Sequence, residues 1–212
     1  MFNILVDLLP NTVEVGGVEY PIATDFRTSI LFEQAVCDPD IDEDSLAKLV
    51  LDYYYPGVTI TKNNMAGLIE QALKFYKGGF DIEDNKVECE DEYSEGEEEI
   101  NDEKIYDYDY DAPYIFSAFM QQYGIDLQRV KYLHWWKFKA MLTSLQEDCK
   151  FCKILEYRSI NLSEIEDEKQ RSFYRKMKEV YKLRTKQVIS EEKKSKQIAE
   201  MLKQGIDPKN LL

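Results

Sequence analysis

The chain has 212 residues, 44% of them hydrophobic, and a formal net charge of −14 at pH 7. A chain of this length can bury one sizeable core or two small ones. It contains no run of eighteen apolar residues and no basic leader before an apolar segment, so we expect no membrane span, no secretory signal and a cytoplasmic location.

The negative charge is concentrated in one segment. Residues 81–111 hold sixteen Asp or Glu residues against Lys86 and Lys104, and the rest of the chain is neutral in sum. Because residues 81–105 contain few apolar side chains, they cannot bury enough surface to offset the entropy of ordering, and we expect a disordered acidic linker. A nucleic-acid mimic or a metal trap is the alternative, although the carboxylates lack the intervals of a calcium loop. The positive balance after residue 166 favours electrostatic contact within the chain or with a partner.

The first 80 residues predict a module of one β-hairpin and three helices. Two alternating segments flank Gly16 and Gly17, a pair that tolerates the positive φ of a tight hairpin turn. Capping residues and apolar side chains at three- and four-residue intervals predict helices over about residues 25–36, 43–55 and 64–76. An isolated two-stranded ribbon is marginal in water, so we expect it to lie on these helices.

Tyrosine and aspartate alternate from Tyr106 to Asp111. Strict alternation favours a short strand with tyrosines on one face and carboxylates on the other. Tyrosines in this arrangement are typical of interfaces, but an extended arm that lays them on its own domain is an equal alternative.

The densest helical pattern follows this repeat. A helix is predicted over Ala112–Tyr123, with a cap at Asp111 and a stop at Gly124. Apolar spacing predicts a second helix from about Asp126 to Leu145. The two helices would form an αα-hairpin that organises a second module over residues 106–186.

Two more helical segments are expected toward the C-terminus. Ser163 and Glu166 have the spacing of a capping box and predict a helix with a basic surface. Residues 187–212 read as a lysine-rich helical tail. The basic helix has the charge and aromatics that nucleic-acid binding requires, but the negative molecule opposes phosphate contacts, so we expect no nucleic-acid partner.

No pattern points to catalysis. Phosphate-binding loops, dinucleotide fingerprints and zincin motifs are absent from the sequence, and His134, the single histidine, lies within a helical pattern. Cys149 and Cys152 form a C-x-x-C, but a second pair is missing, and we interpret them as small packed hydrophobes. We therefore expect a non-catalytic protein without metal or cofactor; a metal or redox enzyme that depends on the two cysteines is the alternative.

A family resemblance is carried by four segments and by their order along the chain. They are VGGVEYPIATDFR, DAPYIFSAFMQQYGIDL, LHWWKFKAML and EYRSI. Over roughly residues 1–183 the chain resembles the gene product fifteen family of tailed phages that infect Gram-positive bacteria. The resemblance implies a tail-assembly chaperone of siphoviruses that binds the tape-measure protein, keeps it soluble and passes it to tail-tube subunits. It also implies a location in the host cytoplasm and absence from the mature virion. Homo-oligomers are compatible with it, and an acidic protein that binds a host protein is the alternative.

The predicted fold is mainly α, with an N-terminal β-hairpin, an acidic linker and a C-terminal helical module. A tape-measure helix exposes apolar faces, which a grooved helical partner can cover. We expect the partner to meet those aromatic residues that the internal core does not use, among Tyr106, Tyr108, Tyr110, Tyr114, Phe116, Phe119, Trp135, Trp136 and Phe138.

Overall fold

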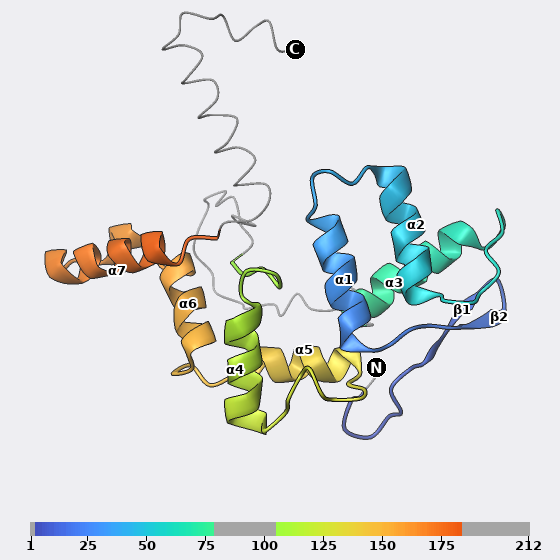
Figure 1. Cartoon of the computed structure of the whole chain (residues 1–212), viewed down its shortest axis with the longest axis horizontal. Coiled ribbons are helices and arrows are strands. Elements are labelled where there is room, and N and C mark those ends of the chain that lie inside the picture. Colours follow the sequence, from blue (N-terminus) through green and yellow to red (C-terminus); the bar gives the residue numbers. More distant parts are fainter. Residues whose placement is uncertain (1–2, 79–104, 184–212) are drawn as a thin grey trace, which may run out of the picture. The chain divides into compact units, whose positions relative to one another are not determined.

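The computed structural model describes residues 3–78 and 105–183 (Figure 1). The acidic linker expected over residues 81–105, apart from its last residue, and the lysine-rich tail expected over residues 187–212 lie outside the described residues. The elements in chain order are β1 (Thr12–Val15), β2 (Val18–Pro21), α1 (Phe26–Val36), α2 (Glu43–Tyr54), α3 (Met65–Lys77), α4 (Ala112–Tyr123), α5 (Trp135–Thr143), α6 (Lys150–Ser159) and α7 (Glu168–Val180). The predicted class, mainly α with one N-terminal hairpin, is confirmed.

The described residues form two compact units. The first contains residues 3–36, 41–78 and 127–144, and the second contains residues 37–40, 105–126 and 145–183. The segment that carries α5 therefore groups with the N-terminal helices, although the sequence suggested consecutive modules over residues 1–80 and 106–186.

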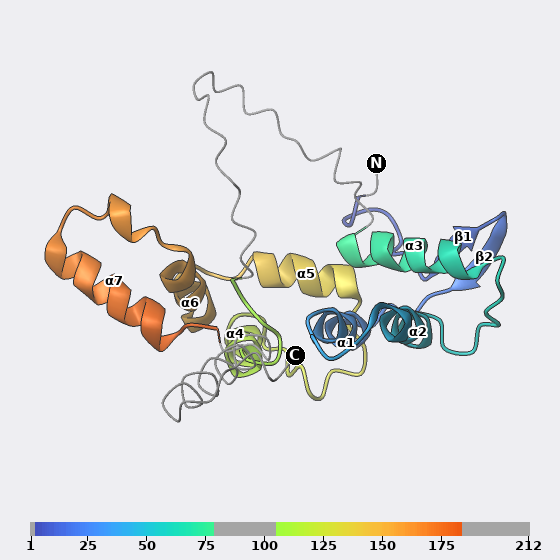
Figure 2. The same cartoon turned by 90° about the horizontal axis from the view of Figure 1, so that it is seen from above.

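In the first unit, the β1–β2 hairpin lies against α3, α1 packs on α2 and α5, and α2 packs on α3 (Figure 2). The hairpin turns at Gly16 and Gly17, whose φ angles of 60° and 78° are positive, as the sequence predicts. The core between the helices is largely aromatic, and its fully buried side chains include Tyr54, Leu68, Trp135 and Phe138.

The ends of α2 and α3 are set by local capping. The carboxylate of Asp42 accepts a hydrogen bond from Ser45 N at 2.9 Å and starts α2. Gly78 adopts a left-handed conformation with φ 100° and ends α3. Because these signals act over a few residues, the sequence predicted both helices close to their observed bounds.

The predicted helix from Asp126 to Leu145 is wrong in its first part. The helix α5 begins at Trp135, and the preceding residues form a loop, so the αα-hairpin around Gly124 is absent. The loop pairs with the start of α1, where Phe26 N donates to Leu133 O at 2.9 Å and Trp135 N donates to Thr24 O at 2.8 Å. These long-range bonds occupy backbone groups that a continuous helix would need for itself.

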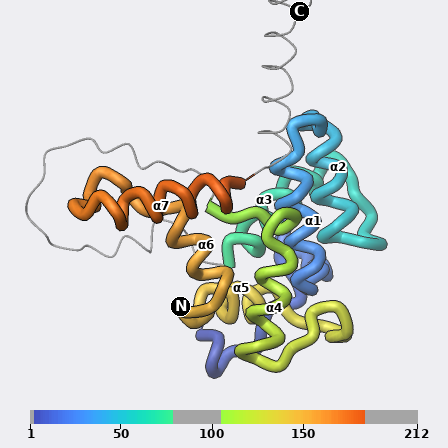
Figure 3. The backbone as a smooth tube through the Cα atoms, turned by 60° about the vertical axis from the view of Figure 1, so that its left-hand side comes forward, coloured from blue at the N-terminus to red at the C-terminus, as the bar shows by residue number. Residues whose placement is uncertain are grey.

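In the second unit, α4 packs against α6, and α7 packs against α6 and a short 3-10 helix, Leu162–Glu164 (Figure 3). The observed bounds of α4 match the prediction, but the expected side-chain cap at Asp111 is wrong, because the carboxylate of Asp111 binds Arg158 and makes no capping bond. The expected capping box at Ser163 and Glu166 is wrong, because Asp167 caps α7 by accepting from Gln170 N at 2.7 Å.

The Tyr-Asp repeat forms a turn, and the short strand considered for it is not observed. The carboxylate of Asp107 accepts from the amides of Asp109 and Tyr110, both at 2.9 Å. Aspartate side chains commonly bond the backbone in this way, which competes with strand pairing.

Candidate functional site

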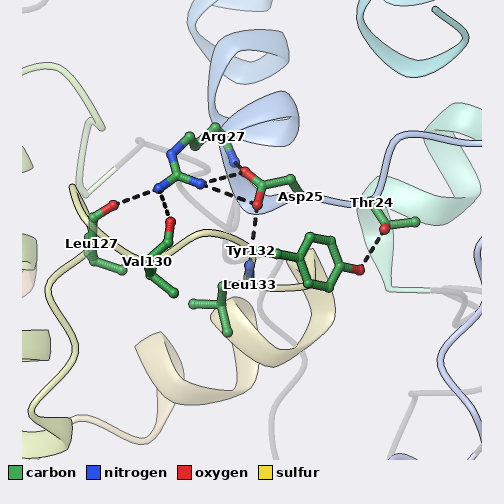
Figure 4. Close-up of polar contacts among 7 residues, drawn as sticks. All are labelled: Thr24, Asp25, Arg27, Leu127, Val130, Tyr132 and Leu133. Atoms are coloured by element: carbon green, nitrogen blue, oxygen red, sulfur yellow. Dashed lines mark hydrogen bonds and ion pairs between the residues drawn. The ribbon is translucent and has the colours of Figure 1, made fainter.

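A polar network joins the start of α1 to the loop before α5 within the first unit (Figure 4). Arg27 Nη2 donates to Leu127 O at 2.9 Å and to Val130 O at 2.7 Å, and its Nη1 pairs with Asp25 at 3.0 Å. Asp25 also accepts from Leu133 N at 3.2 Å. Main-chain carbonyls and one carboxylate thus hold the guanidinium, and the network positions the loop.

The histidine completes this junction. His134 Nδ1 accepts from Trp136 N at 3.1 Å and caps α5, while Nε2 lies 3.1 Å from Pro10 O. The ring must therefore be neutral, with its proton on Nε2 for donation to the carbonyl. Burial lowers the pKa of His134, and the nearby charge of Lys137 adds to this effect. The histidine expected inside a helix lies instead at its N-terminus.

The two tryptophans cap the C-terminal end of α3. Trp135 Nε1 donates to Tyr76 O at 2.8 Å, and Trp136 Nε1 donates to Phe75 O at 2.7 Å. Lys139 Nζ reaches Lys77 O at 3.2 Å. The last carbonyls of a helix lack partners within it and carry partial negative charge, so indole N–H groups and an ammonium are favourable there. The side chains of the W-W-x-x-K sequence, Trp135, Trp136 and Lys139, thus cap the C-terminal end of α3.

A buried ion pair organises the second unit. Arg158 binds both carboxylate oxygens of Asp111, at 2.6 and 2.8 Å, and the two side chains are 6% and 0% exposed. The same guanidinium donates to Ile105 O at 2.9 Å and to Tyr181 O at 2.6 Å. One side chain therefore ties together the residue before the Tyr-Asp repeat, the start of α4 and the end of α7.

The two cysteines of the C-x-x-C pair lie at the start of α6. Cys149 Sγ accepts from Cys152 N at 3.4 Å and caps the helix. Burial raises the pKa of Cys152 to about 11, so its thiol stays protonated at neutral pH. Within residues 3–78 and 105–183 no group of three or more metal-ligating side chains is placed to hold an ion. Cys152 Sγ also donates to Leu145 O at 3.8 Å, so the described contacts of the pair are a helix cap and a bond to the main chain.

The nine predicted partner-binding residues divide between the two units. Trp135, Trp136 and Phe138 belong to the first, and the other six belong to the second. Four are buried in their own unit and cannot meet a partner from these positions: Tyr108, Phe119, Trp135 and Phe138. Five are half-buried and keep some accessible ring surface: Tyr106, Tyr110, Tyr114, Phe116 and Trp136.

The most exposed apolar side chains lie elsewhere. Leu5, Val6 and Leu8 of the first unit are 87%, 76% and 95% exposed. Their backbone forms a turn in which Asp7 N donates to Asn3 O at 2.8 Å. The sequence could have pointed to this turn through the apolar residues before Pro10. The predicted partner contacts were all aromatic and so did not include them. Several large apolar side chains exposed within one short segment are typical of binding surfaces.

Neither described range contains a helix with the length and apolar character needed to cross a membrane. Comparison with known families shows a match over residues 5–183 to the family described as "Bacteriophage Gp15 protein". No curated protein and no solved structure matches the chain.

Proposed function

The chain belongs to the Bacteriophage Gp15 family, and from this premise we propose that it is a tail-assembly chaperone. In this role it is non-catalytic and binds the tape-measure protein, keeps it soluble and recruits tail-tube subunits. It acts in the cytoplasm of the host cell and leaves before the virion is complete.

The observation that carries the proposal is the exposed apolar turn of the first unit. Leu5, Val6 and Leu8 present branched side chains that are at least three-quarters exposed. Each would gain roughly 1.5–3 kcal/mol on full burial against an apolar partner. A long tape-measure helix with an exposed apolar face supplies such a surface, and covering that face would prevent its aggregation.

The partly exposed aromatic residues of α4 offer a second contact. Tyr114 and Phe116 lie on the helix that Asp111 and Arg158 anchor, and both rings remain half-buried. Rigid aromatic side chains lose little entropy when a partner immobilises them, which favours them at interfaces.

The test is co-expression with the tape-measure protein of the same phage, with an affinity tag on the chaperone. The measured quantities are the fraction of tape measure in the soluble extract and the amount that co-purifies. We expect the wild-type protein to move the tape measure from the pellet into a soluble complex. A variant with Leu5→Ser, Val6→Ser and Leu8→Ser should lose most of this effect.

A matched control changes three exposed polar residues of the same unit, Lys48→Ser, Asp52→Ser and Lys62→Ser. Circular dichroism should show the same helix content in both variants. A tape measure that stays insoluble beside the wild-type protein would refute the chaperone role. If the variant with serine at positions 5, 6 and 8 keeps as much tape measure soluble as the control does, the contact lies outside the N-terminal turn.

A further inference from the structure

One face of α7 carries exposed apolar and basic side chains together. Lys169, Phe173, Lys176 and Val180 follow one another at intervals of four, three and four residues, so they lie along one side of the helix. Phe173 is 49% exposed and Val180 is 55% exposed, and both lysines are exposed. We call these four residues the α7 stripe.

The side of α7 that carries Tyr174 and Lys178 faces α6, and Phe173 lies at the edge of this contact, with its ring 6.2 Å from that of Tyr157. The ring of Tyr174 lies 6.1 Å from that of Tyr157, and Lys178 Nζ donates to Ile160 O at 3.1 Å. By contrast, Lys169 and Lys176 make no hydrogen bond or ion pair with any described residue. The stripe therefore has two unneutralised ammonium groups beside two partly exposed apolar side chains.

We propose that the α7 stripe is the docking surface for residues 81–104 of this same chain. That segment contains thirteen Asp or Glu residues against Lys86 and Lys104, and it also contains Tyr93 and Ile100. Its carboxylates complement Lys169 and Lys176, and its few apolar side chains complement Phe173 and Val180. The proposal does not depend on the chaperone role.

The end of the acidic segment supports an intramolecular contact. Residue 104 precedes Ile105, whose carbonyl accepts from Arg158, and the same guanidinium donates to Tyr181 O directly after α7. The acidic segment thus ends beside the C-terminal end of the helix that carries the stripe. The 13 residues of α7 span roughly 20 Å at 1.5 Å per residue. An extended chain covers this length with about six residues, so residues near 98–104 can reach along the stripe.

Attachment at this point raises the local concentration of the segment. A short flexible tether gives an effective concentration on the order of millimolar, so a weak electrostatic contact can be well populated within one molecule. Salt should weaken it, because the Debye length falls from about 10 Å at 0.1 M to about 3 Å at 1 M ionic strength.

The experiment uses a labelled peptide of residues 81–104 as the probe and the full chain as the receptor. In one receptor, residues 82–103 are replaced by a Gly-Ser sequence of equal length, which leaves Asp81 and Lys104 as the charged residues of the segment. We expect the peptide to bind this neutral-linker protein at least tenfold more tightly than the wild-type protein, whose own segment competes. Binding should weaken about tenfold between 0.1 M and 1 M salt.

Charge reversal at the stripe provides the specific test. Lys169→Glu with Lys176→Glu, placed in the neutral-linker protein, should abolish peptide binding. The matched control reverses two exposed lysines of the first unit, Lys48→Glu and Lys62→Glu, and should bind as before. The changes lie on exposed side chains, so circular dichroism should confirm an intact fold.

Three results would overturn the proposal. The first is equal peptide affinity for the wild-type and neutral-linker proteins, and the second is no binding to either. The third is equal loss of binding in the stripe and control variants. Light scattering at several protein concentrations separates docking within one chain from exchange between two. If the wild-type protein is a dimer and the variant with Lys169→Glu and Lys176→Glu is a monomer, the segment binds a second copy of the chain. That result would refute the intramolecular contact.

Discussion

Arg158 forms two parallel hydrogen bonds to the carboxylate of Asp111, in a position where solvent reaches almost none of either side chain. The pair joins the start of α4 to α6, and the remaining guanidinium donors bind Ile105 O and Tyr181 O. Planar bidentate geometry is the strong form of such a contact, and arginine alone among side chains provides it.

Removing one partner of this pair should be strongly destabilising. Asp111→Asn leaves an uncompensated buried cation, and we expect a loss of about 3–5 kcal/mol in the free energy of unfolding. Replacing both residues, Asp111→Asn with Arg158→Leu, should cost clearly less than the sum of the single changes. Urea denaturation of the four proteins measures this coupling. Additive losses would show that the pair makes no joint contribution.

Loss of the cap that Trp136 provides on α3 should have a smaller effect on the free energy of unfolding. Trp136→Phe keeps an aromatic ring on Phe75, whose centroid lies 5.6 Å away, but removes the donor to Phe75 O. We expect a loss of about 0.5–1.5 kcal/mol in the free energy of unfolding, the usual net contribution of one hydrogen bond, because Phe75 O keeps the bond from Gly78 N at 3.0 Å. Trp136→Ala should cost more, because it also removes the stacked ring. Equal stability of the wild-type and phenylalanine proteins would argue against the cap.

The sequence predicted the elements whose limits are set by nearby residues. The starts or ends of α2, α3 and α4 depend on Asp42, Gly78 and Gly124, each within a few residues of the helix it limits. Such capping signals can be recognised without knowledge of the tertiary fold.

The sequence did not predict the features that depend on distant contacts. The start of α5 is set by bonds between residues more than a hundred positions apart, such as Leu133 N to Asp25. Asp111 and Arg158 are separated by 47 positions, so neither residue type nor spacing suggested their pairing. The aromatic residues were predicted as partner contacts where the core does not use them, but spacing alone does not distinguish a core residue such as Phe138 from an interface residue.

A close approach between the hairpin and α3 gives the third prediction. A Cβ atom on Gly67 would lie 2.5 Å from Val15 Cγ1, which is much closer than van der Waals contact. Gly67→Ala gains about 1 kcal/mol in helix propensity, but the clash should outweigh it and give a net loss of roughly 1–3 kcal/mol. Val15→Ala should recover stability in that background. Thermal unfolding of the single and double variants checks this, and a stabilised Gly67→Ala protein would refute the close packing.

His134 predicts a pH-dependent stability of the first unit. Burial lowers its pKa below the usual 6.5. The unfolded state therefore binds a proton more readily, and the stability provided by the neutral ring is complete above about pH 6.5 and is lost as the pH falls toward the pKa of the folded protein. Protonation of Nδ1 would also remove the acceptor that caps Trp136 N. We expect the wild-type protein to lose more stability between pH 7.5 and 5 than His134→Asn.

Asparagine is the matched replacement, because it is a favoured N-cap residue and does not titrate in this range. At pH 7.5 the variant should be less stable, by about 1 kcal/mol, since a shorter side chain at position 134 loses the bond to Pro10 O. Urea denaturation at several pH values gives the difference between the two proteins, in which the titration of shared carboxylates cancels. Parallel pH profiles would show that the neutral ring is not required. A wild-type profile that falls faster on acidification would instead support the assignment of the Nε2-protonated tautomer and its cap on α5.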